Sequence, residues 1–336
     1  MTAPSQSSVG SRMSFWRAWL AHQHAPFQLG LALVLLTLIV IMTASTPTFL
    51  TTGNVLNVLR QAAPTLIVAV AMTLVITSGG IDLSVGSTLA VIGVLSAVLL
   101  SAGWSWWFVV LLMLGFGSTI GLMNGLLVTL GGLPPFIATL AMLSVLRGIA
   151  QLITKGYSIP VPPNSAFIEL GRGFFLGIPY PIVIAAFALV TGYILFNRTR
   201  FGIYVTGIGS NEEAVRRNGV DTNGVKMKVY VFSGLLAATA GMITSARLAS
   251  GSSYSGIGFE LDVISAVVLG GTNLFGGDGT LLGAFLGTII LAVIGNGLIL
   301  LQVSPFYEQI IKGVILVIAI IVNRGALLRA FRHSQL

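Results

Sequence analysis

The chain has 336 residues, of which 55% are hydrophobic and only 8% are charged. A soluble domain carries about 25% charged residues, so this composition excludes a soluble globular protein and indicates an integral membrane protein. The formal charge of +8 comes from basic residues gathered in a few loops, with no basic stripe that alternates with aromatic residues, which argues against a nucleic-acid partner.

The sequence also offers no metal site. Cysteine is absent, which excludes disulfides, thiolate metal ligands and cysteine nucleophiles. The three histidines, His22, His24 and His333, all lie in the terminal tails. No histidine is therefore available within the membrane for a proton relay or for metal binding.

Apolar stretches between residues 28 and 325 predict the membrane-spanning domain, flanked by the tails 1–27 and 326–336. A helix that rises ~1.5 Å per residue needs about 20 residues to cross about 30 Å of hydrocarbon. The third and eighth stretches are short or rich in Gly and Ser, which is a usual sequence indication of a substrate path. We predict an all-α polytopic bundle of about ten transmembrane helices, with short or discontinuous helices near its centre. The predicted stretches are Gln28–Ser45, Ala62–Thr77, Leu83–Leu100, Trp106–Leu130, Pro135–Ile153, Pro181–Phe196, Met227–Ala246, Glu260–Leu274, Leu281–Leu301 and Phe306–Val322.

The basic residues predict the orientation of the chain. Most of the 17 Lys and Arg residues lie in the N-terminal tail, in the loop 197–228 and in the C-terminal tail. The positive-inside rule therefore places both termini and this loop in the cytoplasm. Six predicted helices precede the loop and four follow it, and these even numbers agree with the charge rule.

An acidic residue lies between the second and third stretches, within Gly79-Gly80-Ile81-Asp82-Leu83-Ser84-Val85-Gly86. Such a residue at membrane depth costs roughly 2.5–3.5 kcal/mol on insertion scales. It is kept where the backbone leaves helical geometry beside a polar pathway or in the protein interior. Asp82 can cap the third helix, and capping does not exclude a place in a pathway. We predict that the pathway or its gate includes Gly79, Gly80, Asp82, Ser84 and Gly86.

A second glycine-rich segment, Gly270-Gly271-Thr272-Asn273-Leu274-Phe275-Gly276-Gly277, resembles the first. Both segments follow helices that run inward, so they are consistent with a parallel internal repeat. Glycine-rich membrane loops also look alike by chance, and the sequence leaves both explanations open. We add Asn273, Gly276 and Gly277 to the predicted pathway.

The loop 197–228 spans about 30 residues, which is long for a connector in a compact membrane protein. Residues 211–220 read as a short helix ended by Gly219, and the segment is either a solvated connector or a docking surface. The candidate docking residues are Glu212, Glu213, Ala214, Arg216, Arg217 and Gly219.

Two further features lie in the fifth and eighth stretches. Arg147 is about three turns into its helix, where an unpaired charge is costly, so we expect it to meet a carbonyl or carboxylate or to extend outward. Glu260 and Asp262 fall in the first turn of their helix, where negative charge suits the helix dipole.

No GxxxxGK[ST] phosphate loop is present, so we expect that the chain does not hydrolyse ATP. GxSxG, HExxH and kinase signatures are also missing.

Three segments together resemble the membrane subunits of bacterial ATP-binding-cassette sugar importers, in particular the ribose-type permeases that serve ribose, xylose, arabinose and galactose. They are GGIDLSVG, PFIATLAMLSVLRG and the run ELDVISAVVLGGTNLFGGDGT from Glu260 to Thr280. The likeness covers residues 28–325. It implies a multi-pass, non-catalytic subunit of the bacterial inner membrane that pairs with a second copy or a paralogue.

The resemblance also implies the other partners. A cytosolic ATPase binds ATP and Mg, so this chain needs no cofactor of its own, and a periplasmic sugar-binding protein delivers the substrate. In the coupling segment of such permeases a Glu-Ala pair precedes a Gly, as Glu213-Ala214 precedes Gly219 here. This likeness favours docking of residues 211–220 on the ATPase.

The sequence leaves three alternatives open. An ion-coupled secondary transporter usually places Asp, Glu or His at the membrane midplane, where only Asp82 qualifies here. The same family with another cargo is the second alternative: branched-chain amino acids, nucleosides or a furanone-type signal. A receptor or structural membrane protein is the third.

Overall fold

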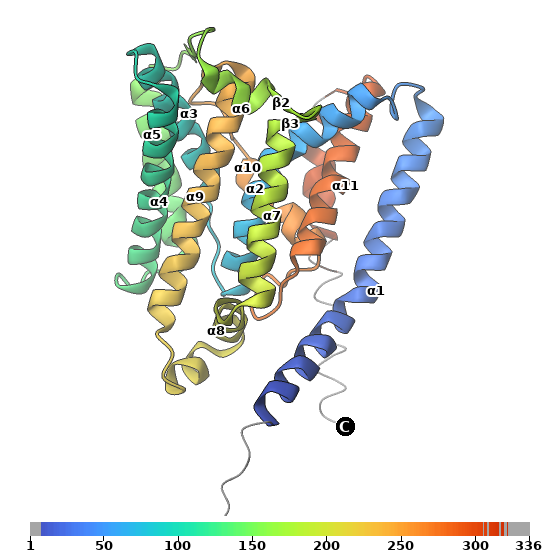
Figure 1. Cartoon of the computed structure of the whole chain (residues 1–336), viewed down its shortest axis with the longest axis vertical. Coiled ribbons are helices and arrows are strands. Elements are labelled where there is room, and N and C mark those ends of the chain that lie inside the picture. Colours follow the sequence, from blue (N-terminus) through green and yellow to red (C-terminus); the bar gives the residue numbers. More distant parts are fainter. Residues whose placement is uncertain (1–7, 305, 308, 316, 319–320, 322–336) are drawn as a thin grey trace, which may run out of the picture.

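The computed structural model describes residues 8–304, 306–307, 309–315, 317–318 and 321. Its described part is built almost entirely of helices (Figure 1). The α-helices are α1 (Ser8–Ser45), α2 (Thr52–Thr77), α3 (Val85–Ser101), α4 (Trp106–Thr129), α5 (Pro135–Thr154), α6 (Glu169–Arg172), α7 (Tyr180–Arg198), α8 (Arg200–Arg217), α9 (Thr222–Leu248), α10 (Phe259–Leu269) and α11 (Leu281–Leu300).

Short strands and one turn of 3-10 helix complete the connection between α5 and α7. The 3-10 helix η1 covers Ala166–Ile168, directly before α6. Strand β1 (Ile159–Pro160) pairs antiparallel with β4 (Ser250–Gly251), which follows α9. Strands β2 (Phe174–Phe175) and β3 (Ile178–Pro179) form a hairpin between α6 and α7. This connection therefore has more structure than the sequence predicted.

The predicted all-α polytopic membrane fold is confirmed. Within the described residues, seven helices are long and apolar enough to cross a membrane: α1, α2, α4, α5, α7, α9 and α11. Helix α3 is apolar and has 17 residues. The described positions of the last predicted stretch are helical, while 308, 316, 319–320 and 322 lie outside the described residues.

The eighth predicted stretch, Glu260–Leu274, does not cross the membrane as one helix. Helix α10 has 11 residues and ends at Leu269, and a helix of this length spans only about 17 Å. Gly270 caps it and Gly271, at φ +92°, turns the chain away from helical geometry. The apolar run was long enough to predict a spanning helix, but these glycines divide it into a half-length helix and a loop.

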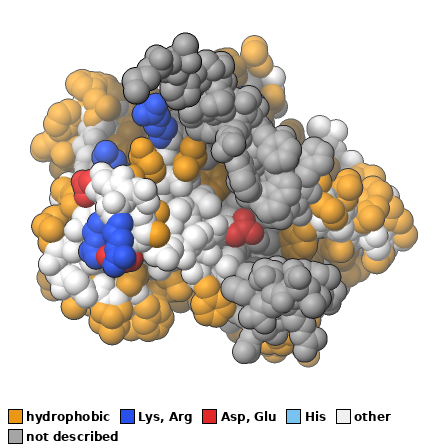
Figure 2. Space-filling model, turned by 90° about the horizontal axis from the view of Figure 1, so that it is seen from below, with side chains coloured by type: hydrophobic (Ala, Val, Ile, Leu, Met, Phe, Trp, Pro, Cys, Tyr) orange, Lys and Arg blue, Asp and Glu red, His pale blue; other side chains and the backbone are white. Residues whose placement is uncertain are grey.

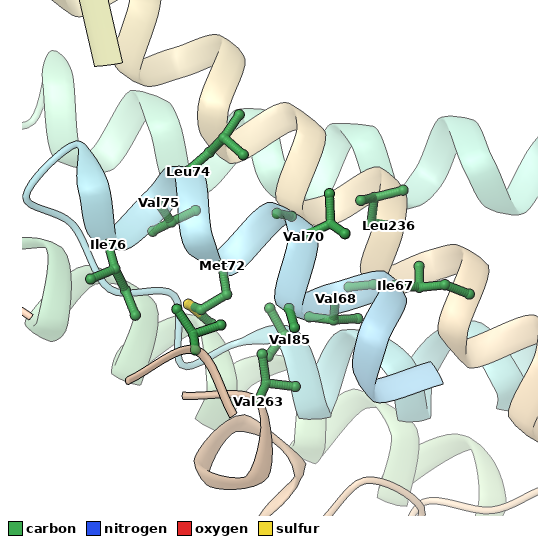
Figure 3. Close-up of a cluster of buried hydrophobic side chains, with 14 of the residues drawn as sticks. Ile67, Val68, Val70, Met72, Leu74, Val75, Ile76, Val85, Leu236 and Val263 are labelled. Carbon is green, nitrogen blue, oxygen red and sulfur yellow. The ribbon is translucent and has the colours of Figure 1, made fainter. Parts of the chain in front are cut away.

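Helices α2 and α9 form the interior of the bundle. Residues 67–76 of α2 are all fully buried, as expected for a helix that is hydrophobic on every side. Figure 3 shows this core, in which α2 side chains such as Val68 and Met72 lie beside Val85 of α3, Leu236 of α9 and Val263 of α10. Helix α1 stands at the edge of the bundle against α11, and most of its side chains from Phe27 onward are exposed (Figure 1).

Glycines allow α4 to pack closely on α9. A Cβ on Gly121 would overlap the carbonyl oxygen of Tyr230, and one on Gly234 would overlap the carbonyl oxygen of Gly117. Gly117 and Gly121 are four residues apart, so they share one face of α4. Small residues at this spacing are the usual means by which membrane helices bring their backbones together.

This packing predicts that Gly121→Val destabilises the bundle by roughly 1–3 kcal/mol, because the added side chain has no room against the α9 backbone. The measurement is the thermal midpoint of the purified protein in detergent. Gly115→Val is the matched control, because a Cβ on Gly115, also in α4, meets no atom within 4 Å. Equal midpoints for the two variants would contradict the close packing.

The segment 197–228 is helical over most of its length rather than a loop. Helix α8 covers Arg200–Arg217 and has one break, at Asn211 (φ −160°, ψ 93°), whose Oδ1 accepts a hydrogen bond from the Ala214 N–H at 2.9 Å. The predicted helix over 211–220 is thus the second part of a longer one. Gly219 ends it at φ +81°, as predicted. Helix α9 begins at Thr222 instead of Met227 because Asp221 caps it through the Gly224 N–H.

Candidate functional site

Asp82 lies in the turn between α2 and α3 and is almost fully buried, with an exposed fraction of 1%. Its Oδ1 accepts hydrogen bonds from the N–H of Ser84 at 3.0 Å and from the Ser84 hydroxyl at 2.7 Å. Its Oδ2 accepts one from the Ser233 hydroxyl of α9 at 2.7 Å. Asn124 of α4 donates to Ser84 Oγ at 2.8 Å and lies 3.4 Å from Asp82 Oδ1. The carboxylate therefore joins three helices, α3, α4 and α9, through hydroxyl and amide donors.

Asp82 is not the N-cap of the third helix, and that interpretation is wrong. The N-cap of α3 is Ser84, whose side chain makes no capping hydrogen bond. Ser84 has helical dihedral angles, and Asp82 lies two residues before it. The Asp82 carboxylate points inward, toward Ser233 of α9. The place of Asp82 in a pathway stays a prediction.

Tyr230 of α9 borders the same turn. A Cβ on Gly80 would lie 2.6 Å from its hydroxyl oxygen, so a larger residue there would require the tyrosine side chain to move. The tyrosine is buried, and its hydroxyl has no hydrogen-bond partner in the part of the chain that the structure describes. Sequence reasoning missed Asn124, Tyr230 and Ser233. Each is a polar residue inside a strongly apolar stretch, and this pattern could have indicated buried polar contacts.

The two glycine-rich segments meet each other at the end of the bundle where α8 lies. The N–H of Gly277 donates to the carbonyl oxygen of Thr77 at 2.9 Å. A Cβ on Gly276 would lie 3.0 Å from the Cα of Gly79 and 3.0 Å from the carbonyl oxygen of Gly209 in α8. A Cβ on Gly209 would overlap both Thr77 O and Gly277 N. We call these five residues the glycine junction.

The dihedral angles of the junction also require glycine at three positions. Gly79, Gly276 and Gly277 have φ of +82°, +88° and +80°. Left-handed backbone of this kind is costly for residues with a side chain. The structure thus brings together three of the predicted pathway residues, and it adds Gly209, which sequence reasoning did not single out.

Gly86 lies apart from the glycine junction, whereas Asn273 adjoins it through Gly276. Gly86 is in α3, where a Cβ would lie 2.5 Å from the carbonyl oxygen of Gly256, so it allows a close approach of the loop before α10. Asn273 shapes its own loop: its side chain donates to the carbonyl oxygen of Gly276 at 3.0 Å and accepts from the N–H of Phe275 at 3.1 Å.

Arg147 meets backbone carbonyls, as predicted. Its guanidinium donates to the carbonyl oxygens of Ser253, Ser255 (2.8 Å) and Gly256 (3.3 Å), which precede α10. Glu260 lies in the first turn of α10, as expected. The arginine thus fastens α5 to the loop that leads into the short helix.

The predicted coupling residues lie on the exposed part of α8, and Figure 2 looks at this end of the molecule, where basic and acidic side chains lie beside each other. Glu213 pairs with Arg216 and with Arg217, the latter at 3.0 Å. Glu212 pairs with Lys226 of α9 at 2.7 Å. These pairs hold the second part of α8 together and tie it to the start of α9.

The fold and these sites define a polytopic membrane protein whose buried core is interrupted by two glycine-rich breaks in mutual contact. Residues 54–320 match the family model described as "Branched-chain amino acid transport system / permease component". The chain belongs to this permease family, and it is therefore a transport subunit.

Curated relatives match over nearly the whole chain. The ribose import permease protein RbsC of Escherichia coli (strain K12) is 40% identical over 323 residues, covering 94% of this chain and 98% of the relative. RbsC of Bacillus subtilis (strain 168) is 42% identical over 298 residues (88% and 92%). The L-arabinose ABC transporter permease protein AraH of Azospirillum brasilense is 35% identical over 298 residues (88% and 87%). These matches confirm the resemblance to ribose-type permeases. A comparison with solved structures found no significant match.

Proposed function

We propose that the chain is the membrane-spanning permease subunit of an ATP-driven importer that carries a monosaccharide from a periplasmic binding protein into the cytoplasm. The observation that carries the proposal is the 40% identity to a ribose import permease over 94% of the chain. The relative that carries L-arabinose supports a pentose or a similar sugar as cargo. ATP and Mg would then be bound by a separate ATPase subunit.

Residues 211–219 of the α8 region are proposed to dock on that ATPase. All of them are exposed except Glu212 and Val215, which are half-buried, and Glu213 and its arginine partners hold them as a defined helical surface. The first part of α8 touches both glycine-rich segments through Gly209. A displacement of α8 would therefore reach the α2–α3 and α10–α11 breaks directly, because backbone touches backbone there and cannot be compressed.

The orientation of the chain in the membrane and its pairing with a second subunit are also proposed. Basic residues favour a cytoplasmic position for α8 and both tails in the inner membrane. A second copy of this chain, or a paralogue, would complete the translocation path between two subunits. The predicted pathway residues would then act at the breaks rather than at a deep binding pocket.

A branched-chain amino acid is the second candidate cargo, because the matching family model is described by that transport system. The ribose and L-arabinose permeases among the relatives favour a sugar. The family description alone does not separate the two cargoes, since this chain matches both that family model and the ribose permeases.

Reconstitution tests the proposal. The purified permease, with a cognate ATPase and a cognate binding protein, is placed in liposomes and supplied with radiolabelled ribose, L-arabinose or leucine. We expect ATP-dependent sugar accumulation at least about tenfold above that of the permease alone, which should hydrolyse no ATP. An ATPase subunit with an inactivated catalytic residue is the control. Leucine uptake in place of sugar uptake would favour the second cargo, and sugar uptake by the permease alone on an ion gradient would refute an ATP-driven importer.

A further inference from the structure

The hydroxyl of Tyr230 is left out of the hydrogen bonds around Asp82. The side chain lies in α9 and has an exposed fraction of 1%. Its oxygen has no hydrogen-bond partner among the residues that the structure describes, whereas the hydroxyls of Ser84 and Ser233 both donate to the Asp82 carboxylate. A buried hydroxyl of this kind gives up its hydrogen bonds to water and gains none in return. Phenylalanine would therefore be the more stable residue at this position in this conformation.

Tyr230 and Ser233 point from α9 toward the same turn. They are three residues apart, which places them on one face of the helix. Ser233 donates to Asp82 Oδ2 at 2.7 Å, and the Tyr230 oxygen borders Gly80, two residues before Asp82. The charge of Asp82 is close enough to act on the tyrosine, although the two groups are not hydrogen-bonded. The carboxylate thus has one α9 hydroxyl bound and a second α9 hydroxyl nearby.

The turn that carries Asp82 adjoins the glycine junction. Gly79 belongs to both, and a Cβ on Gly276 would lie 3.0 Å from its Cα. Tyr230 is nearer than Ser233 to Thr222, the first residue of α9, which lies at the end of the bundle where α8 is found (Figure 1). A displacement of the turn toward α8, by no more than one helical turn of about 5.4 Å, would carry the carboxylate from Ser233 to Tyr230.

We propose that Tyr230 is the alternative hydrogen-bond donor to Asp82, and that the carboxylate exchanges Ser233 for Tyr230 when the permease changes between its transport states. The inference rests on the proposed function, which supplies the ATP-driven change of state. The exchange replaces one buried hydroxyl donor by another and leaves the charge in place, so it gives two discrete arrangements of similar free energy. A hydroxyl that lacks a partner in one state and gains one in the other favours that other state.

Tyr230→Phe separates this role from a structural one, because stability and uptake should not fall together. We expect the thermal midpoint of the purified permease in detergent to stay the same or to rise, since no hydrogen bond of this state is lost. ATP-driven uptake of radiolabelled ribose or L-arabinose, measured with a cognate ATPase and binding protein in liposomes, should fall at least about tenfold. Tyr193→Phe is the matched control, because Tyr193 is an exposed tyrosine of α7. This variant should match wild type in both measurements.

A second substitution sharpens the test. Ser233→Ala removes the α9 donor of the state described here, so it should lower the midpoint. Combined with Tyr230→Phe, it takes away the α9 donor of both states and restores the balance between them. The double variant should therefore take up sugar at least about threefold faster than Tyr230→Phe, although it is less stable. Two substitutions that only damage the structure would instead lower uptake further when they are combined.

Three results would overturn the inference. A lower midpoint for Tyr230→Phe would show that the hydroxyl already has a partner in this state, such as a buried water molecule. Wild-type uptake by Tyr230→Phe, or slower uptake by the double variant than by Tyr230→Phe, would show that Tyr230 takes no part in the exchange. Absence of ATP-dependent uptake by the wild-type complex would remove both the proposed function and this inference, whereas equal uptake by wild type and Tyr230→Phe removes the inference alone.

Discussion

Asp82→Leu is expected to abolish substrate uptake and to lower the stability of the bundle. The leucine removes the acceptor of the Ser84 and Ser233 hydroxyls, and it adds an apolar side chain among buried donors. Each buried donor left without a partner costs about 1–3 kcal/mol. Asp82→Asn keeps one acceptor oxygen, and its amide can donate to Ser233, so uptake should fall by less than about tenfold.

Two measurements separate a structural role from a place in the pathway. Uptake in cells, normalised to the amount of permease in the membrane, is compared with the thermal midpoint of the purified protein. If Asp82 only joins α3, α4 and α9, uptake and midpoint fall together across both variants. If the carboxylate also serves the pathway, Asp82→Asn lowers uptake while the midpoint stays close to wild type.

The control for this series is Glu169→Leu, which removes an exposed carboxylate at the end of the bundle opposite α8. It should leave uptake within about twofold of wild type, because exposed substitutions away from packed contacts have small effects. Near-normal uptake and stability of Asp82→Leu would show that the hydrogen bonds of the Asp82 carboxylate are needed neither for transport nor for the stability of the bundle.

The sequence predicted most helices well because local signals mark their ends. Helix α5 begins at Pro135 and ends before Lys155, in agreement with the predicted stretch 135–153, since proline suits the first helical turn and a left-handed residue ends the helix. Helix α10 was predicted too long because apolar composition continues past the glycines that end it. Helix α8 was predicted too short because it is polar and its first part gains stability from packing.

The site around Asp82 was only partly predictable, because the residues that form it lie far apart in the sequence. Asp82 stood out because a carboxylate is rare in such a stretch, and Arg147 because burial of its charge demanded an acceptor. The partners of Asp82 lie 42 and 151 positions away, at Asn124 and Ser233. No local pattern links these residues to Asp82. The sequence therefore predicted a helix cap at Asp82, whereas in the fold its carboxylate accepts hydrogen bonds from residues distant in the sequence.

Gly209→Ala is expected to reduce uptake at least about tenfold while the ATPase still co-purifies with the permease. Exchanging a helical glycine for alanine normally stabilises a helix by about 1 kcal/mol. Here the added methyl group would overlap Thr77 O and Gly277 N, so it must push α8 away from both glycine-rich segments. Residues 211–219 are not altered, and docking of the ATPase should persist.

Two glycine variants provide the comparison. Gly115→Ala, in α4, has free space around it and should transport like wild type. Gly219→Ala has free space as well but adopts φ +81°, so it adds backbone strain of roughly 1–2 kcal/mol and should weaken the end of α8 without separating the glycine junction. Its uptake should therefore lie between those of the other two.

The decisive readout is the ATP hydrolysis that the binding protein stimulates in the reconstituted complex. If the glycine junction carries movement between the ATPase and the breaks in the core, Gly209→Ala should keep basal hydrolysis and lose the stimulated part, because the two ends of the molecule no longer move together. Equal stimulation in Gly209→Ala and Gly115→Ala would show that α8 acts on the core by another route. That outcome would direct attention to the contact between Glu212 and Lys226, through which α8 also holds the first turns of α9.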